Sequence, residues 1–334
     1  MPNHLARPQA LVARRAALFL AGLFATAIAA QRADAELLYV TTGLGNSIVT
    51  YDISLGSAGA VQASGATFVS LSGNANGITI DSANNVYVLE VANASSNTTL
   101  KKFNQSGTLL TSFAATDGTP NLYADEGLAV RPNGNILGVD QGGAVLEFDP
   151  NGTPVRTFGV GNLSFPVGIA LDGSGNSYVA NSGGTTISKF AADGTFTSNL
   201  VTTNLSGPEG VAIRGGSLYV TNAVGDDVSV FNLLNGSFQQ SITGSMDTPV
   251  GIGFDSAGNF YVANPGDTTI SKFNSSGVHQ FSWTHAAGGT PQFLAVAPVP
   301  EPTAMGLAVS GLVCGGYMLR RRRAAHSQAR QRAA

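Results

Sequence analysis

Residues 167–190 have the sequence VGIALDGSGNSYVANSGGTTISKF, and the pattern returns at residues 250–273 as VGIGFDSAGNFYVANPGDTTISKF. Each copy holds three short runs of alternating β-branched, aromatic and small residues, separated by turns rich in Gly, Asn and Asp. Short alternating runs separated by turns of this composition are typical of β-strands joined by hairpins. A fourth run follows the first copy near Thr195–Leu200. Four short strands in one repeat are typical of a blade of a β-propeller.

The first strand of this unit recurs along the chain. Gly127, Gly168, Gly210 and Gly251 stand 41, 42 and 41 residues apart. The strand is expected at Asn76–Asp81, Glu126–Arg131, Val167–Asp172, Glu209–Arg214 and Val250–Asp255, with a degraded copy at Gln292–Ala297. Second strands are expected at 86–90, 136–140, 177–181, 218–222 and 260–264.

The two ends of the repeat region predict how the ring closes. Leu37–Val40 matches a second strand, Asn46–Tyr51 a third, and Gly65–Leu71 can supply a fourth. Their missing first strand is the unpaired Phe293–Ala297. We therefore predict an all-β fold, a six-bladed β-propeller closed by pairing of the C-terminal strand with the N-terminal blade, which removes both sheet edges.

The repeat also resembles a known family. Gly-Ile-Ala-hydrophobic-Asp, then Tyr-Val-Ala-Asn, then Ile-x-x-Phe, is similar to the NHL-repeat propellers over residues 37–298. The resemblance implies the propeller fold. It implies no single function, because this architecture carries both enzymes and binding modules.

The N-terminal segment predicts export. Arg14 and Arg15 precede an apolar run over 16–30, and the small-residue site Ala33-Asp34-Ala35 follows. This order is typical of a secretory signal peptide, here residues 1–35, with cleavage after Ala35 or, alternatively, near Ala30. An uncleaved anchor and a twin-arginine signal are the other interpretations.

The C-terminal segment predicts sorting. Pro300, Glu301 and Pro302 precede an apolar run over 303–319, followed by Arg320, Arg321, Arg322 and Arg323. As a helix the run would span about 26 Å, barely a bilayer core. The order over residues 299–323 resembles the PEP-CTERM sorting signal. The resemblance implies that an exosortase recognises the Pro-Glu-Pro motif and removes the tail after transient inner-membrane anchoring, with 324–334 as a basic cytoplasmic tip. An ordinary C-terminal anchor is the alternative.

Charge and cysteine content limit the function of the central region. Residues 36–298 carry 7 basic against 18 acidic side chains, a formal charge of −11, whereas the whole chain has −3. An acidic body argues against binding nucleic acid. The single cysteine, Cys314, lies in the C-terminal run, so the repeats hold no disulfide.

Polar residues are expected to gather at one mouth of the central channel, because first strands start and antiparallel second strands end on the same face. The inner ring comprises Asn76, Glu126, Val167, Glu209, Val250 and Gln292, and the outer ring comprises Thr42, Glu90, Asp140, Asn181, Asn222 and Asn264. Glu126, Asp140 and Glu209 supply the hard oxygen ligands that calcium prefers. Gluconolactonase-like and paraoxonase-like propellers, which look similar, hold a metal there. Alternatively, the asparagines satisfy backbone groups at strand ends.

Groups for catalysis are scarce. His279 and His285 come late in the last complete repeat and are expected on the outer rim, and no Gly-x-Ser-x-Gly motif is present. We therefore expect a non-catalytic module that is secreted or held at the cell surface and binds a carbohydrate, peptide or protein of the extracellular matrix. The alternatives are a metal-dependent lactonase- or lyase-type enzyme at the channel mouth and a structural protein without a ligand.

Overall fold

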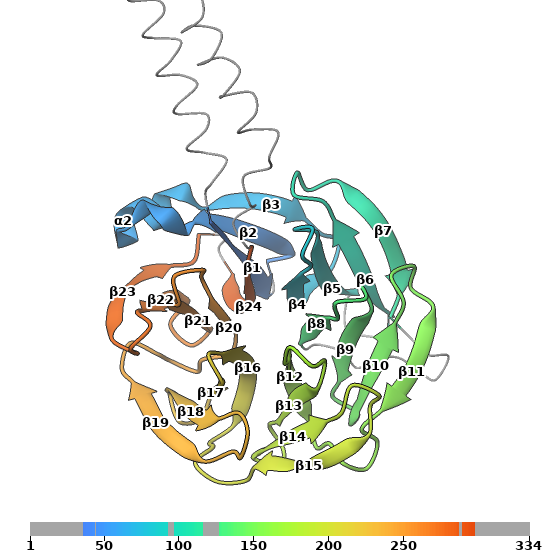
Figure 1. The fold of residues 1–334 in the computed structure, drawn as a ribbon. Coiled ribbons are helices and arrows are strands. Elements are labelled where there is room, and N and C mark those ends of the chain that lie inside the picture. Colours follow the sequence, from blue (N-terminus) through green and yellow to red (C-terminus); the bar gives the residue numbers. More distant parts are fainter. Residues whose placement is uncertain (1–35, 44, 93–96, 116–126, 287–288, 298–334) are drawn as a thin grey trace, which may run out of the picture. The chain divides into compact units, whose positions relative to one another are not determined.

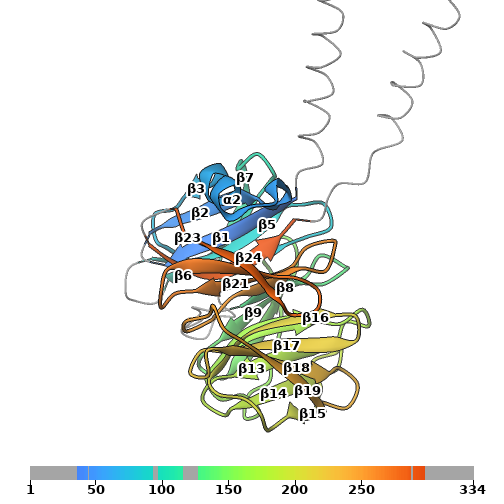
Figure 2. The ribbon, with the colours of Figure 1, turned by 90° about the vertical axis from the view of Figure 1, so that its left-hand side faces the viewer.

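The computed structural model describes residues 36–43, 45–92, 97–115, 127–286 and 289–297. Within them lie 24 strands in six antiparallel sheets of four strands each. The sheets stand around a central channel like the blades of a propeller (Figure 1), and Figure 2 shows the same ring turned by 90°. The predicted all-β, six-bladed fold is confirmed.

The strands follow one another outward from the channel in each blade. Blade 1 is β24 (Thr290–Val296), β1 (Leu37–Gly43), β2 (Ser47–Asp52) and β3 (Ala66–Ser70); blade 2 is β4 (Asn74–Ile80), β5 (Val86–Ala92), β6 (Asn97–Phe103) and β7 (Leu109–Ala114). Blade 3 is β8 (Leu128–Val130), β9 (Ile136–Asp140), β10 (Ala144–Phe148) and β11 (Pro154–Phe158); blade 4 is β12 (Pro166–Leu171), β13 (Ser177–Asn181), β14 (Thr186–Phe190) and β15 (Phe196–Val201). Blade 5 is β16 (Pro208–Arg214), β17 (Ser217–Asn222), β18 (Asp227–Asn232) and β19 (Phe238–Thr243); blade 6 is β20 (Ile252–Phe254), β21 (Phe260–Asn264), β22 (Thr269–Phe273) and β23 (His279–Thr284).

Blade 1 closes the ring with strands from both ends of the repeat region. β24 pairs antiparallel with β1, from Leu38 opposite Val296 to Gly43 opposite Thr290. The Thr41 hydroxyl adds to this pairing, because it accepts from the Phe293 N–H at 3.0 Å and donates to the Phe293 carbonyl at 3.1 Å. The predicted closure by the C-terminal strand is confirmed.

Burial is greatest in the second strands of the blades and least in the outermost strands. All five residues of β13 and of β21 are buried, because blades pack against both faces of a second strand. The outer strand β19 instead exposes five of its six residues. The buried strands of a blade are therefore mostly apolar, whereas the outermost strands contain more polar residues, as expected for sheets packed face to face.

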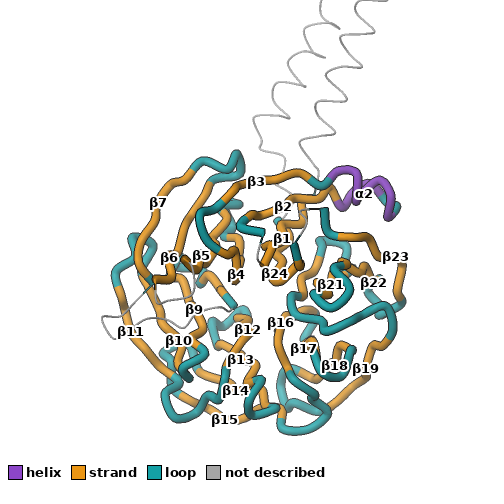
Figure 3. Tube along the Cα trace, turned by 180° about the vertical axis from the view of Figure 1, so that it is seen from behind, coloured by secondary structure: helices purple, strands orange, loops and turns teal. Residues whose placement is uncertain are grey.

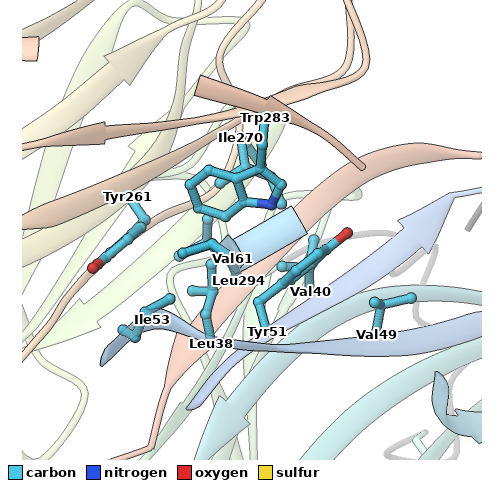
Figure 4. Close-up of a cluster of buried hydrophobic side chains, with 11 residues drawn as sticks. Leu38, Val40, Val49, Tyr51, Ile53, Val61, Tyr261, Ile270, Trp283 and Leu294 are labelled. Carbon is cyan, nitrogen blue, oxygen red and sulfur yellow. The ribbon is translucent and has the colours of Figure 1, made fainter. Parts of the chain in front are cut away.

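A short helix was not predicted. α2 (Ala58–Ser64) follows the 3-10 turn η1 (Ile53–Leu55) between β2 and β3, and it lies at the outer edge of the ring beside β23 (Figure 3). Its buried Val61 joins a cluster with Tyr51 and Trp283, which Figure 4 shows packed against Leu294. The helix covers the outer end of the seam between blades 6 and 1.

Candidate functional site

Those predicted mouth residues that the structure describes lie on one face of the ring, which we call the mouth face. Strand register pairs Pro166 with Asn181 and Pro208 with Asn222, so first strands start where second strands end. Leu38 and Val296 lie at the other end of their strands. Both ends of the described ring therefore lie on the opposite face.

A bulge at the start of the first strand explains the repeated glycine. The register shifts between Pro166 and Ile169, and again between Pro208 and Val211. A Cβ at Gly168 would lie 2.2 Å from the Glu209 carbonyl, and a Cβ at Gly210 would lie 2.1 Å from the Val250 carbonyl. The glycines permit close approach of neighbouring first strands, so their role is packing.

Hydrogen bonds join these bulges around the channel. The Gly127 N–H donates to the Val167 carbonyl at 2.7 Å, and the Gly251 N–H donates to the Gln292 carbonyl at 3.0 Å. Between blades 5 and 6 the Thr221 hydroxyl bridges the two strands in place of a direct backbone hydrogen bond. It accepts from the Gly210 N–H and donates to the Val250 carbonyl, both at 2.7 Å. Hydrogen bonds thus join neighbouring first strands at three of the junctions between blades along the inner rim of the mouth.

Below this rim lies a cavity of about 240 Å³. Glycines and apolar side chains of the first strands line it, among them Ile169, Val211, Ile252 and Leu294. Its walls offer few side chains for polar chemistry. The polar groups available to a ligand lie above it, on the mouth face.

Two outer-ring asparagines, Asn181 and Asn222, form hydrogen bonds that hold mouth-face loops in place. The Asn181 Oδ1 accepts from the Ser164 N–H at 3.1 Å, and its Nδ2 donates to the hydroxyls of Thr186 and Ser188 at 3.0 and 2.9 Å. Asn222 accepts from the Ser206 N–H at 3.0 Å in the same way. Both side chains are buried, so these two asparagines tie a mouth-face loop to the hairpin of its own blade.

Asn264 repeats only half of this arrangement. Its Nδ2 donates to the Thr269 and Ser271 hydroxyls at 3.2 and 2.9 Å, as the other two asparagines do to their hairpins. Its Oδ1, fully buried, has no hydrogen-bond partner within the described residues. This leaves one buried acceptor without a donor on the blade 6 side of the mouth face.

Glu90 takes the place of the asparagine in blade 2. Its buried Oε1 accepts from the N–H groups of Ser72 and Gly73 at 2.6 and 2.8 Å, and its Oε2 pairs with Lys101. Burial raises the pKa of Glu90, but the Lys101 ammonium and the Ser72 and Gly73 donors outweigh burial, and the pKa lies below its ordinary value. The Glu90 carboxylate therefore has a structural role.

Three further predicted mouth residues, Asp140, Gln292 and Asn76, are half-buried. The Asp140 Oδ1 accepts from the Gly142 N–H at 2.9 Å within its own hairpin. Gln292 donates to the Thr290 hydroxyl at 3.0 Å, and Asn76 lies in β4. Glu126 lies outside the described residues. The Glu126, Asp140 and Glu209 calcium site accordingly stays a prediction, and the described residues form no cluster of three or more Asp, Glu, His or Cys side chains.

Glu209 lies in the bulge at the start of β16, and one hydrogen bond to its carboxylate is seen within the described residues. Within the described part of the chain its hydrogen-bond partner is the Ser182 hydroxyl, which donates to Oε1 at 3.2 Å. Burial raises the pKa of the Glu209 carboxyl above its ordinary value, and the Ser182 hydroxyl offsets part of that rise. Glu209 is a partly desolvated acid at the mouth without a counterion among the described residues.

Sequence reasoning missed Phe165, whose backbone contacts the same Ser182 that donates to Glu209. Its carbonyl accepts from the Ser182 N–H at 3.0 Å, and its side chain is 61% exposed. The position precedes the first-strand proline and takes a left-handed φ in three blades, at Phe165 (47°), Gly207 (64°) and Thr248 (52°). A bulky residue is costly in this conformation, so an exposed phenylalanine here is unusual.

Sequence reasoning also misplaced His285. His279 lies on the outermost strand β23, as expected, but His285 turns inward after it and is 4% exposed. Its Nε2 lies 2.8 Å from the Thr42 hydroxyl, and its Nδ1 lies 2.9 Å from the Tyr51 hydroxyl. Burial lowers the pKa of His285 to about 4. The imidazole is thus a neutral link across the seam between blades 6 and 1.

The predicted sorting elements lie outside the described residues. These are the signal peptide 1–35, the motif Pro300, Glu301 and Pro302, the run 303–319 and the arginine cluster. Of the helices in the described part of the chain, none has the length and hydrophobicity to cross a bilayer.

Comparison with known proteins supports the fold. No protein-family model matches the chain, and no curated protein sequence matches it. Among solved structures, a chain of a nidogen–laminin complex is similar with a TM-score of 0.69 at 15% identity, over 79% of this chain and 99% of that one. A streptogramin B lyase is similar with a TM-score of 0.51 at 17% identity, over 81% and 75%. Virginiamycin B lyase from Staphylococcus aureus gives 0.55 at 14% identity, over 75% and 85%. At such identities the likeness shows the propeller fold alone.

Proposed function

We propose that this chain is an exported binding module that holds an extracellular carbohydrate or protein on the mouth face of its propeller. The observation that carries the proposal is the group formed by Phe165, Ser182 and Glu209. It offers an exposed aromatic ring and a lightly held carboxylate, whereas Asn181, Asn222 and Glu90 on the same face are committed to the fold. Aromatic rings with a few convergent polar groups are typical of binding sites.

The hydrogen bonds along the mouth face also favour a binding role. The first strands are joined by backbone hydrogen bonds, and the asparagine links fix the surrounding loops. A rigid surface loses little conformational entropy when a partner binds. Export rests on the order of elements in residues 1–35 and 299–323, from which we infer that an exosortase processes the tail and leaves the ring secreted or at the cell surface.

Processing is tested by mass spectrometry of the protein produced in a bacterium that has an exosortase. We expect a mature chain that begins at Glu36 and lacks the apolar run 303–319, and we expect Glu301→Ala to retain that run. A mature wild-type protein that keeps both ends would refute the export route.

Binding is tested with the full chain, purified in a non-ionic detergent, on an array of polysaccharide fragments and synthetic peptides. We expect at least one class of probe to bind and Phe165→Ala to abolish that binding. The matched control is Phe238→Ala, which removes an exposed phenylalanine (44%) from the outer strand β19. Equal loss in both variants, or no binding by the wild type, would contradict a site at the mouth.

A further inference from the structure

Ser182 contacts a backbone carbonyl of blade 4 and a carboxylate of blade 5 on the mouth face. Its N–H donates to the Phe165 carbonyl at 3.0 Å, and its hydroxyl donates to the Glu209 carboxylate at 3.2 Å. Phe165 belongs to the loop before β12 in blade 4, and Glu209 belongs to β16 in blade 5. The two residues are therefore each in direct contact with one common residue on the mouth face.

The charge of Glu209 has no counterion among the described residues. The ion pairs there engage Glu90, Asp81 and Glu147. Removing a carboxylate from water without a counterion is unfavourable, which is why burial raises the pKa of Glu209. A cation placed beside Glu209 would remove this cost.

The described mouth-face loops carry no lysine or arginine. All seven basic residues of the ring lie in strands or in turns of the opposite face: Lys101, Lys102, Arg131, Arg156, Lys189, Arg214 and Lys272. The mouth-face loops of blades 5 and 6 carry Asp226, Asp247 and Asp267 instead. The buried Asn264 Oδ1 on this side also lacks a donor within the described residues.

We propose that Phe165, Ser182 and Glu209 form a subsite for one arginine or lysine side chain of a basic, extended segment of a partner protein. Lysine and arginine are cationic donors without acceptors, and they therefore complement a face whose described loops carry acidic but no basic side chains. The Phe165 ring, which is 61% exposed in a loop of the same face, offers a cation–π contact. A divalent metal fits less well, because calcium takes six to eight oxygen ligands whereas this group offers one carboxylate and one hydroxyl.

The acidic loops around the subsite would act at longer range. Exposed carboxylates of one sign attract a basic segment and speed its encounter with the face, an effect that weakens as salt screens it. The subsite itself is partly desolvated, so its contribution depends less on salt. The proposal rests on the proposed function and specifies the chemistry of the partner.

The test uses two synthetic peptides that differ in a single central residue, arginine or its neutral isostere citrulline. Each is titrated at millimolar concentration into the full chain in a non-ionic detergent, and heat is measured at low and at physiological salt. We expect the arginine peptide to bind at least about fivefold more tightly than the citrulline peptide. Equal binding of the two peptides would overturn the proposal.

Matched variants locate the effect. Glu209→Gln preserves the acceptor for Ser182 but removes the charge, so it should remove most of the preference for arginine. Asp149→Asn makes the same change of charge in an exposed turn of the opposite face and should leave the preference unchanged. Unaltered fluorescence of Trp283 shows that each variant is folded. If Phe165→Ala abolishes binding of an array probe but arginine confers no advantage, the binding face stands and the cationic subsite fails.

Discussion

The buried imidazole of His285 should make the ring sensitive to mild acid. In the unfolded chain its pKa is near 6.5, whereas burial lowers it to about 4 in the folded protein. Between these values the unfolded state binds the proton and the folded state does not. Stability is therefore fully present above about pH 6.5 and is lost as the pH falls toward 4.

The size of this loss follows from the two pKa values. The full difference corresponds to roughly 3 kcal/mol below pH 4, and about 2 kcal/mol is already lost between pH 7.5 and 5. The upper window is the better one for measurement, because Asp81, Asp172 and Glu90 have lowered pKa values and lose their contributions only at lower pH. Glu209 has a raised pKa and acts in the opposite direction as the pH falls.

The assay compares wild type with His285→Gln by urea denaturation at pH 7.5 and 5, in the full chain. The single tryptophan, Trp283, packs edge-on against Tyr51 with ring centroids 5.6 Å apart, so its fluorescence reports this seam. We expect the wild type to lose about 2 kcal/mol more than the variant over this window. Parallel loss in both proteins would refute the argument. Tyr51→Phe keeps the buried imidazole and should keep the steeper pH dependence.

Further substitutions test the packing and hydrogen bonds described above, each by the midpoint of urea denaturation. Gly210→Ala places a Cβ 2.1 Å from the Val250 carbonyl and should cost about 3 kcal/mol or more, whereas Gly173→Ala meets nothing within 4 Å and should change little. Gly194→Ala and Gly161→Ala share a left-handed φ, but only Gly194 lies against a ring, with its Cβ 3.0 Å from Phe158, so it should cost about 1 kcal/mol more. Asn222→Ala leaves the Ser206 N–H without its acceptor and should cost about 2 kcal/mol while leaving probe binding intact.

The repeat predicted the fold well because each strand has the same neighbours in every blade. The second strands expected at 177–181 and 260–264 have those bounds in the structure. Ring closure could be predicted as well. The N-terminal end of the repeat region has a second strand, Leu37–Val40, without its first strand, and the C-terminal end has a first strand, Phe293–Ala297, without its second strand. α2 escaped prediction because its seven residues are held by Val61, which packs against the distant Trp283.

The site was less predictable because its chemistry departs from the repeat. The outer-ring positions were found, but the use of Asn181 depends on a loop N–H that no sequence pattern marks. His285 contacts Tyr51 and Thr42, which lie 234 and 243 residues away in sequence. Phe165 occupies a position filled by Gly207 and Thr248 in other blades, so the repeat gives no reason to expect an aromatic residue there.

The path of the chain through blade 1 separates the point of ring closure from the proposed binding face. The Ala297 N–H donates to the Leu37 carbonyl at 2.9 Å, so both ends of the ring leave it side by side on the face opposite the mouth. Glu36 is fixed there by the Ser256 N–H at 2.6 Å, in the first hairpin of blade 6. Within the described ring, Leu37 and Ala297 therefore lie on the face opposite Phe165 and Glu209, so the point where the ring closes and the proposed binding face use different residues.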